Sequence, residues 1–304
     1  MADGAVAVAP YPVGALLPGT VYRITALLGS GGMGVVYEVE DTTIGKRYVV
    51  KVLHAHLDDR AELTRRLELE AKTLAKLAHP NIVEIVTAGV TKDEHALPFF
   101  VMERLNGRIL REVLERKGAL APVHSLPIAI DLLEALAHAH GLGVVHRDVK
   151  PENIFLHRGL VGGTRAKLLD FGILGFIEQS LGGKVGVTVR YASPEQLVGA
   201  LPTPASDIYG AGLVLYEMVG GRGPFDDVVA VEAIVSAHME RLPPSLAASV
   251  PPALWTWISA ALEKDPMKRP PDAATFAKGL RTVVAALEEH APSPFSWPPP
   301  KPHR

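Results

Sequence analysis

The first hundred residues of this chain alternate between apolar and polar side chains in the manner of β-strands. The pattern is β-like from residue 21 to about residue 53, where residues 35–40 alternate and residues 47–53 form a second run. Two further strand-like runs follow at residues 82–86 and 99–102. The spacing therefore predicts a small sheet at the start of the chain.

Most of the remaining chain has the apolar spacing of helices. Residues 59–77 carry leucines at helical intervals among charged residues, and the pattern stops before His79-Pro80. Further helices are predicted at residues 128–140, 211–219, 253–263 and 272–289. A mostly β front followed by a mostly α back predicts an α+β protein of two lobes.

The predicted lobes have a connection and two tails. We expect an N-terminal lobe at about residues 17–103, a hinge at about 103–107 and a C-terminal lobe at about 108–290. Residues 1–16 are expected to form a flexible tail. Residues 291–304 (APSPFSWPPPKPHR) are rich in proline and are expected to be an extended tail.

Composition narrows the class of protein. The 304 residues are 48% hydrophobic, which allows a substantial core. Lys and Arg number 31 against 33 Asp and Glu, so no overall basic field favours nucleic acid or an anionic membrane. The lack of cysteine excludes disulfides, thiolate zinc sites and a cysteine nucleophile. Because no apolar stretch reaches about 18 residues and the N-terminus lacks the positive region of a signal peptide, we expect a cytoplasmic protein without a membrane segment.

A glycine cluster is the first candidate for chemistry. Residues 29–34, Gly-Ser-Gly-Gly-Met-Gly, fit G-x-G-x-x-G, and Val36 follows. Glycines let backbone amides approach phosphate oxygens closely. The spacing alone also fits a dinucleotide-binding fold or a flexible turn. A strand follows these glycines, whereas a dinucleotide fold needs a helix there, so the pattern favours two strands that cover a nucleotide.

Lys51 stands inside an apolar strand. A lysine that faces the interior needs an anionic partner to offset its desolvation, although an edge-strand lysine facing water is the common alternative. The helical segment downstream offers Glu70, with Glu68 as a neighbour that could be confused with it. We expect Lys51 to pair with Glu70.

The most specific pattern is at residues 146–153, where His-Arg-Asp-Val-Lys-Pro-Glu-Asn fits H-R-D-x-x-x-x-N completely. Asp-Phe-Gly follows at residues 170–172 and Ser-Pro-Glu at 193–195. With the glycine cluster and Lys51, these motifs stand in the order of the eukaryotic-type protein kinases. The chain resembles that family over roughly residues 17–289, close to its bacterial, Hanks-type serine/threonine branch. The resemblance implies a bilobal protein-kinase fold, with one helix beside the antiparallel sheet of the small lobe.

The resemblance also implies transfer of the ATP γ-phosphoryl group to protein hydroxyls. Such a transfer mainly requires positioning and charge neutralisation. Asp148 would accept or orient the proton of the attacking hydroxyl, and Lys150 would lie near the γ-phosphate. Asn153 and Asp170 would supply oxygen ligands to Mg²⁺, for which Mn²⁺ can substitute.

The nucleotide contacts follow from the same resemblance. Lys51 would hold the α- and β-phosphates and would itself be held by Glu70. Met102 would be the gatekeeper beside the adenine. The full set of expected ATP contacts is Leu28, Gly29, Ser30, Gly31, Gly32, Met33, Gly34, Val36, Val49, Lys51, Met102, Glu103, Leu105 and Phe155.

Five other positions resemble structural members of the family. His146 looks like part of the hydrophobic spine, together with Phe171. Asp207 resembles the buried aspartate that anchors the catalytic-loop backbone. Glu195 and Arg269 resemble the buried ion pair of the larger lobe.

The activation segment departs from the common pattern. Thr188 aligns with the threonine that contacts the catalytic aspartate and lysine, but Val187 stands where glycine is usual. Before Ser193, the segment contains only Ser180 and Thr188 as hydroxyl residues. Ser180 is therefore the candidate phosphosite, and we expect activation to differ from a doubly phosphorylated threonine loop.

Two other functions compete with an active kinase. A pseudokinase, acting as an ATP-binding or scaffolding module, is disfavoured because Lys51, Asp148, Asn153 and Asp170 are all retained. A small-molecule phosphotransferase is disfavoured by Lys150 and by the Ser-Pro-Glu segment. The expected partners are ATP and protein substrates, with no nucleic acid, and a homodimer is the expected species for trans-autophosphorylation.

Overall fold

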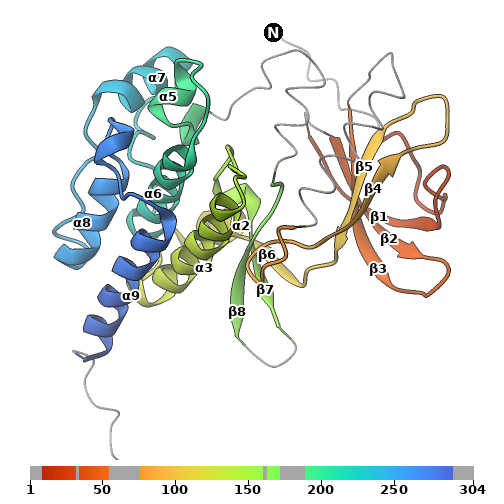
Figure 1. Ribbon diagram of the computed structural model, residues 1–304, viewed down its shortest axis with the longest axis horizontal. Helices are drawn as coiled ribbons and strands as arrows, with labels where there is room; N and C mark the ends of the chain where they lie inside the picture. Colours follow the sequence, from red (N-terminus) through yellow and green to blue (C-terminus); the bar gives the residue numbers. More distant parts are fainter. Residues whose placement is uncertain (1–8, 32–33, 55–75, 160–162, 172–188, 290–304) are drawn as a thin grey trace, which may run out of the picture.

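The N-terminal lobe is a five-stranded antiparallel sheet in the order β1-β2-β3-β5-β4 (Figure 1). The computed structural model describes residues 9–31, 34–54, 76–159, 163–171 and 189–289. The strands of this sheet are β1 (Tyr22–Gly31), β2 (Gly34–Asp41), β3 (Arg47–Leu53), β4 (Ile85–Val90) and β5 (Pro98–Glu103). The helix predicted at residues 59–77 lies almost wholly outside the described residues.

Strict alternation gives the two faces of this sheet different roles. On β2, Val35, Tyr37 and Val39 are buried in the core of the lobe, and on β3 Val50 and Val52 join them. The residues between them must point to the opposite face, because successive side chains of a strand alternate. That opposite face looks toward the second lobe and carries the site described below.

The C-terminal lobe is mainly helical, with a small three-stranded sheet where it meets the first lobe (Figure 1). That sheet contains β6 (Gly107–Ile109), β7 (Ile154–Arg158) and β8 (Thr164–Leu168). The helices are α2 (Leu110–Lys117), α3 (Pro122–Gly141), α5 (Pro194–Leu197), α6 (Pro204–Gly220), α7 (Val231–Glu240), α8 (Pro252–Ala261) and α9 (Ala273–Glu289), with short 3₁₀ turns η1 (Pro151–Asn153), η2 (Val189–Tyr191) and η3 (Pro266–Lys268). The prediction of a bilobal α+β fold is confirmed.

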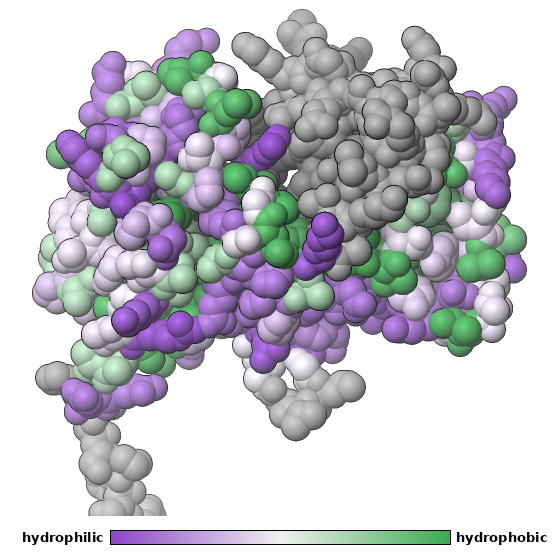
Figure 2. Space-filling model, in the orientation of Figure 1, coloured by the Kyte–Doolittle hydropathy of each residue, from purple (hydrophilic) through white to green (hydrophobic). Residues whose placement is uncertain are grey.

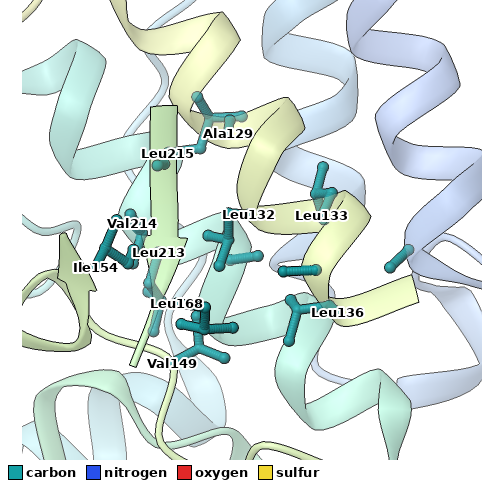
Figure 3. Packing of buried hydrophobic residues seen from close by; sticks show 14 of the residues in the cluster. Ala129, Leu132, Leu133, Leu136, Val149, Ile154, Leu168, Leu213, Val214 and Leu215 are labelled. Carbon is teal, nitrogen blue, oxygen red and sulfur yellow. The ribbon is translucent and has the colours of Figure 1, made fainter. Parts of the chain in front are cut away.

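The core of the second lobe lies between α3 and α6 and reaches β7 and β8 (Figure 3). Helix α6 is buried along residues 206–219, which is unusual for a helix of a soluble domain and makes it the central support of the lobe. Val149 of the catalytic loop packs directly on this helix. A β-carbon at Gly210 would come within 2.9 Å of the Val149 β-carbon, so glycine is what allows this close approach.

The structure corrects two predictions near the N-terminus. Residues 9–16 belong to the fold rather than to a flexible tail, because Tyr11 is buried in the core of the first lobe and Gly14 donates a backbone hydrogen bond to Ile24 (2.8 Å). The strand predicted at residues 82–86 begins instead at Ile85. Ile82 is buried against β8, where it forms an isolated parallel bridge with Leu168, so this apolar run reflects lobe packing rather than the ladder of the first sheet.

The described surface is mixed in character. On the face drawn in Figure 2, hydrophobic residues form small separate groups among hydrophilic ones over the helical lobe. Among the helices that the structure describes, none is both long and apolar enough to span a membrane.

Candidate active site

A cavity of about 480 Å³ lies between the two lobes. Its upper wall comes from β1, β2 and β3, its back from β5 and the following linker, and its floor from β6, β7 and the two residues after β8. Among the residues predicted to contact ATP, those that line this cavity are Leu28, Gly29, Val36, Val49, Lys51, Met102, Glu103, Leu105 and Phe155. Asp170 lies at the cavity as well. The structure therefore brings residues from five strands and two lobes to one concave, largely apolar site, as a nucleotide base requires.

The glycine cluster stands at the ends of β1 and β2, where Gly29 lines the upper wall and the other described glycines lie beside the cavity. Gly31 pairs with Gly34 across the two strands, and residues 32–33 are outside the described part of the chain. A β-carbon on Gly29 or Gly31 would enter open space. At Gly34 it would lie 2.2 Å from the Val52 carbonyl oxygen, so this position requires glycine for the approach of β3. The cluster thus combines one packing glycine with positions that leave the backbone accessible.

Lys51 projects from β3 into the cavity and forms an ion pair across the two lobes. Its Nζ donates to Asp170 Oδ2 at 2.6 Å. The Lys51 side chain is only 10% exposed and that of Asp170 is 27% exposed, so the contact is largely shielded from water. Glu70, the partner predicted for Lys51, lies outside the described residues. The described partner is the aspartate predicted to bind metal.

Three polar residues of the catalytic loop form a cluster around one carboxylate oxygen. Asp148 Oδ2 accepts from Lys150 Nζ at 2.7 Å and from Asn153 Nδ2 at 2.9 Å. Asn153 Nδ2 also donates to the Asp148 backbone carbonyl at 2.8 Å. Of the two contacts to the carboxylate, the one from Lys150 is charge-assisted and is therefore the stronger. The cluster fixes the orientation of Asp148, although none of its three residues is among those that line the cavity.

Asp207 on α6 anchors the backbone of this loop. Its two carboxylate oxygens accept from the backbone N–H groups of His146 and Arg147, both at 2.8 Å, and Oδ2 also lies 2.8 Å from His140 Nε2. Arg147 has φ +73°, a left-handed conformation that is costly for a residue with a side chain. The buried carboxylate of Asp207 holds that strained turn in place.

His146 has a structural place, as its resemblance implied. The residue is fully buried, and its ring makes an edge contact with Phe171 at a centroid distance of 4.6 Å. Its Nε2 lies 2.7 Å from the Leu169 carbonyl oxygen, which can only accept, so Nε2 carries the hydrogen. Its Nδ1 accepts from the Asp148 backbone N–H at 3.2 Å. The neutral imidazole thus connects the catalytic loop to the segment before Asp170.

The two predicted metal ligands lie close to each other. Leu169, next to Asp170, donates its backbone N–H to the Asn153 carbonyl at 2.8 Å. The side-chain hydrogen bonds of Asn153 use Nδ2 and not its amide oxygen. One amide oxygen and one carboxylate fit a hard cation that takes its other ligands from water and phosphate. The described residues contain no group of three or more His, Cys, Asp or Glu side chains that could hold a metal ion. A cation bound in this part of the chain would therefore also need ligands other than protein side chains.

Glu195 and Arg269 form a buried bidentate ion pair beneath the site. Arg269 donates to the two oxygens of Glu195 at 2.8 and 2.9 Å and to backbone carbonyls of the loops around it. Burial tends to raise the pKa of Glu195, but the hydrogen bonds from Arg269 and Ser206 outweigh it and lower that pKa to about 2. The pair is therefore fully charged at neutral pH.

A second charged network was not predicted from the sequence. Arg111 on α2 contacts Glu152 in the catalytic loop (2.7 Å), Glu217 on α6 (2.6 Å) and the hydroxyl of Tyr191. Tyr191 also donates to Glu217 at 2.5 Å, and burial, followed by the negative charge of Glu217, raises the pKa of its hydroxyl. No local motif signals this network, because its members are 26 to 106 residues apart along the chain.

The remaining residues predicted to form the site either do not line the cavity or lie outside the described residues. Ser30, Gly31 and Gly34 belong to β1 and β2 beside the cavity but do not line it. Other predicted positions lie outside the described residues, namely Gly32, Met33, Glu70, Ser180, Val187 and Thr188.

Comparisons with known proteins agree with this geometry. A family model described as "Protein kinase domain" matches residues 22–279. The serine/threonine-protein kinase pkn2 of Myxococcus xanthus is 37% identical over 284 residues, which cover 89% of this chain and 33% of that protein. The serine/threonine-protein kinase PknA of Mycobacterium tuberculosis is 36% identical over 293 residues, which cover 95% of this chain and 66% of PknA. The chain thus spans between a third and two thirds of the length of these relatives.

A solved structure has a similar fold. The crystal structure of the Mycobacterium tuberculosis PknI kinase domain superimposes with a TM-score of 0.69 at 25% sequence identity, covering 90% of this chain and 99% of that domain. The whole of that catalytic domain is therefore represented in the present fold.

Proposed function

Because this chain belongs to the protein kinase domain family and is a Hanks-type serine/threonine kinase catalytic domain, we propose that it is catalytically active and phosphorylates protein serine and threonine hydroxyls. ATP is the phosphoryl donor in this family. The observation that carries the proposal is that a charged pair lining the cavity is joined to a charged cluster in the catalytic loop. Lys51 with Asp170 approaches from the two lobes, and the cluster around Asp148 lies beside them through the Leu169–Asn153 backbone bond.

The residues support an in-line transfer in which one bond forms and one breaks. The substrate hydroxyl oxygen forms a bond to the γ-phosphorus, while the bond from that phosphorus to the oxygen shared with the β-phosphate breaks and ADP leaves. Asp148 orients the hydroxyl and takes its proton. Lys150, which already lies 2.7 Å from Asp148, offers positive charge to the phosphoryl oxygens.

Nucleotide binding is supported by the cavity walls. Val36, Val49 and Phe155 line the cavity and would enclose the flat adenine, while Lys51, which also lines it, would hold the phosphates. Asn153 and Asp170 are the residues that would hold Mg²⁺, or Mn²⁺ in its place. When bound, the cation neutralises phosphate charge that develops during transfer.

The cellular setting is part of the proposal. We expect action in the cytoplasm on protein substrates, with a homodimer as the species that phosphorylates itself in trans. Ser180 is the proposed phosphosite of the activation segment. If stoichiometric phosphate at Ser180 proved to be required for activity, the expectation of an unusual activation route would be wrong.

The test is incorporation of labelled phosphate from ATP and Mg²⁺ into the protein itself and into a generic basic protein. We expect incorporation by wild type and a loss of about 10³-fold or more in Asp148→Asn, because the amide can no longer take the proton. Asp227→Asn is a matched control, since that carboxylate is exposed and pairs with Arg241 away from the cavity (2.8 Å). Equal activity of Asp148→Asn and Asp227→Asn would contradict the assignment of Asp148.

Absence of incorporation by every form would favour the pseudokinase, provided that ATP still stabilises the protein against heat. Turnover on a metabolite but on no protein would favour a small-molecule phosphotransferase.

A further inference from the structure

Two neighbouring charged residues of the linker between the lobes are held from opposite sides. Glu103 Oε1 accepts from Lys167 Nζ on β8 at 2.5 Å and from the backbone N–H of Glu84 at 2.9 Å. The next residue, Arg104, forms an ion pair through its Nε with Glu38 on β2. Glu103 is therefore tied to β8 of the C-terminal lobe, and Arg104 is tied to β2 in the upper wall of the cavity.

Glu38 occupies an unusual position for a carboxylate. It shares the cavity face of β2 with Val36, and the facing residue across the strand pair is Val49. The residue is only 9% exposed. A carboxylate in a largely apolar wall is costly unless it is paired and hydrogen-bonded.

Three partners from three segments satisfy this carboxylate. Besides Arg104, Glu38 Oε1 accepts from Thr25 Oγ1 on β1 and from Arg47 Nη1 on β3, both at 3.2 Å. The hydrogen bond from Arg104 is the main cause that lowers the pKa of Glu38, and burial opposes it. Glu38 is thus the point at which β1, β2 and β3 are joined to the linker.

The Glu38–Arg104 pair lies where it can affect binding of the nucleotide. Both residues line the cavity, and Arg104 stands between Glu103 and Leu105, whose backbone is expected to bond the adenine edge. The pair therefore joins the upper wall of the cavity to its back, where the adenine edge would lie. It has no contact with Asp148 or Lys150 among the contacts that the structure describes.

We propose that Glu38 and Arg104 are positioning residues. Their ion pair fixes the distance between the β1–β2 strands and the linker, and this distance determines the affinity for the nucleotide. The expected change in KM rests on the proposed kinase activity, whereas the expected change in the Kd for ADP does not. When the strands above the site are already fixed, less conformational entropy is lost as the nucleotide binds, so the binding free energy is more favourable. The pair should therefore affect binding of ATP and ADP more than the chemical step.

The chain provides a matched control in the second arginine on the same carboxylate. The side chains of Arg104 and Arg47 are similarly exposed, at 45% and 56%, and both contact Glu38. Only Arg104 lines the cavity and belongs to the linker. If only the loss of positive charge around Glu38 matters, substitution of Arg104 and of Arg47 should change the Kd equally. If Arg104 has a positioning role, its substitution should change the Kd more.

The experiment measures the Kd for ADP by calorimetry and the KM and kcat for ATP in Arg104→Gln, Arg104→Lys and Arg47→Gln. For Arg104→Gln we expect Kd and KM to rise about 3- to 10-fold while kcat stays within about two-fold, which is the range of a partly exposed ion pair. Arg104→Lys should recover at least half of this effect on a logarithmic scale, and Arg47→Gln should leave Kd within about two-fold.

Three results would overturn the inference: an unchanged Kd in Arg104→Gln, an equal rise in Arg47→Gln, or a loss confined to kcat. The melting temperature of each variant shows whether it is folded. If Arg104→Gln does not fold, Arg104→Lys is compared with Arg47→Gln instead. Because Kd for ADP needs no turnover, a rise in Kd without activity in any form would support the positioning role while contradicting the proposed function.

Discussion

The two lobes hold their site residues by different means. In the sheet lobe, alternation along β2 and β3 buries Val35, Tyr37 and Val50 on one face and thereby directs Lys51 to the other. In the helical lobe, the catalytic loop has little regular structure and is held by buried charged groups such as Asp207. Apolar packing is spread over many contacts, whereas a buried charge depends on a few partners.

This difference predicts where single changes matter most. Removing one partner of a buried charge leaves the other uncompensated, which costs more than the loss of one apolar contact or of one hydrogen bond at a lobe's edge. The largest effects should therefore come from the helical lobe, and changes that remove a single hydroxyl in the sheet lobe should have the smallest.

Arg269→Leu should have the largest effect on stability. The side chain of Arg269 is fully buried, and its loss leaves Glu195 charged and without its bidentate partner. We expect the free energy of unfolding to fall by about 3–5 kcal/mol, measured by urea denaturation at pH 7. A loss below about 1 kcal/mol would show that the pair is not an anchor of the lobe.

The pH dependence of that difference provides a control. The pKa of Glu195 is about 2 in the folded protein against an ordinary 4.5, so its contribution is fully present above pH 4.5 and is lost as the pH falls through about 2. Without Arg269, burial is opposed mainly by the hydrogen bond from Ser206, so the pKa of Glu195 rises and the variant should take up a proton at higher pH than wild type. The stability gap between wild type and Arg269→Leu should therefore narrow as the pH falls from 7 toward 4.5. A gap that widens would contradict this account.

Asp207→Asn should have an intermediate effect on stability and a strong effect on activity. Asparagine has one acceptor oxygen instead of two, so it cannot accept from His146 and Arg147 as the carboxylate does. We expect a loss of about 1–3 kcal/mol in the free energy of unfolding, because a buried N–H group loses its partner. Relaxation of the strained Arg147 should misplace Asp148 and lower kcat by about 10²-fold.

Asp131→Asn separates the loop effect from a general loss of stability. Asp131 also accepts a backbone N–H, that of Ala166 at 2.8 Å, but it lies on α3 away from the catalytic loop. We expect Asp131→Asn to lower stability without changing kcat by more than about two-fold. If both variants lost kcat in proportion to stability, Asp207 would be only a structural residue.

The sequence contained more of the sheet lobe's arrangement than of the helical lobe's. The period-two pattern is a local signal, so the strands around Lys51 and its direction toward the cavity could be predicted. The motifs at residues 146–153 and 170–172 identified the polar groups of the site through resemblance to a family rather than through their spacing. The contact of Lys51 with Asp170 and the network around Arg111 depend on the packing of distant segments, and no local pattern determines such packing.

The two corrections have the same origin. Ile82 belongs to an apolar run that reads as a strand, but its partner is Leu168 of the other lobe. Residues 9–16 lack any strand or helix pattern, so nothing local indicates that Tyr11 is buried. Irregular segments become part of a core through single anchoring side chains, which a periodic pattern cannot register.

Tyr11→Phe tests that last correction and should have the smallest effect. The Tyr11 hydroxyl lies 2.8 Å from Asp93 Oδ2 and 3.1 Å from Thr91 Oγ1, and burial raises the pKa of this hydroxyl to about 12. Phenylalanine keeps the ring in the core but removes the hydrogen bonds, so we expect a loss of about 0.5–1.5 kcal/mol in the free energy of unfolding with kcat unchanged. Tyr22→Phe, in β1 of the same lobe, is the matched control and should change stability by less than about 0.5 kcal/mol. Equal results for the two variants would mean that the hydrogen bonds of the Tyr11 hydroxyl do not help to anchor residues 9–16 and that the buried ring alone holds this segment.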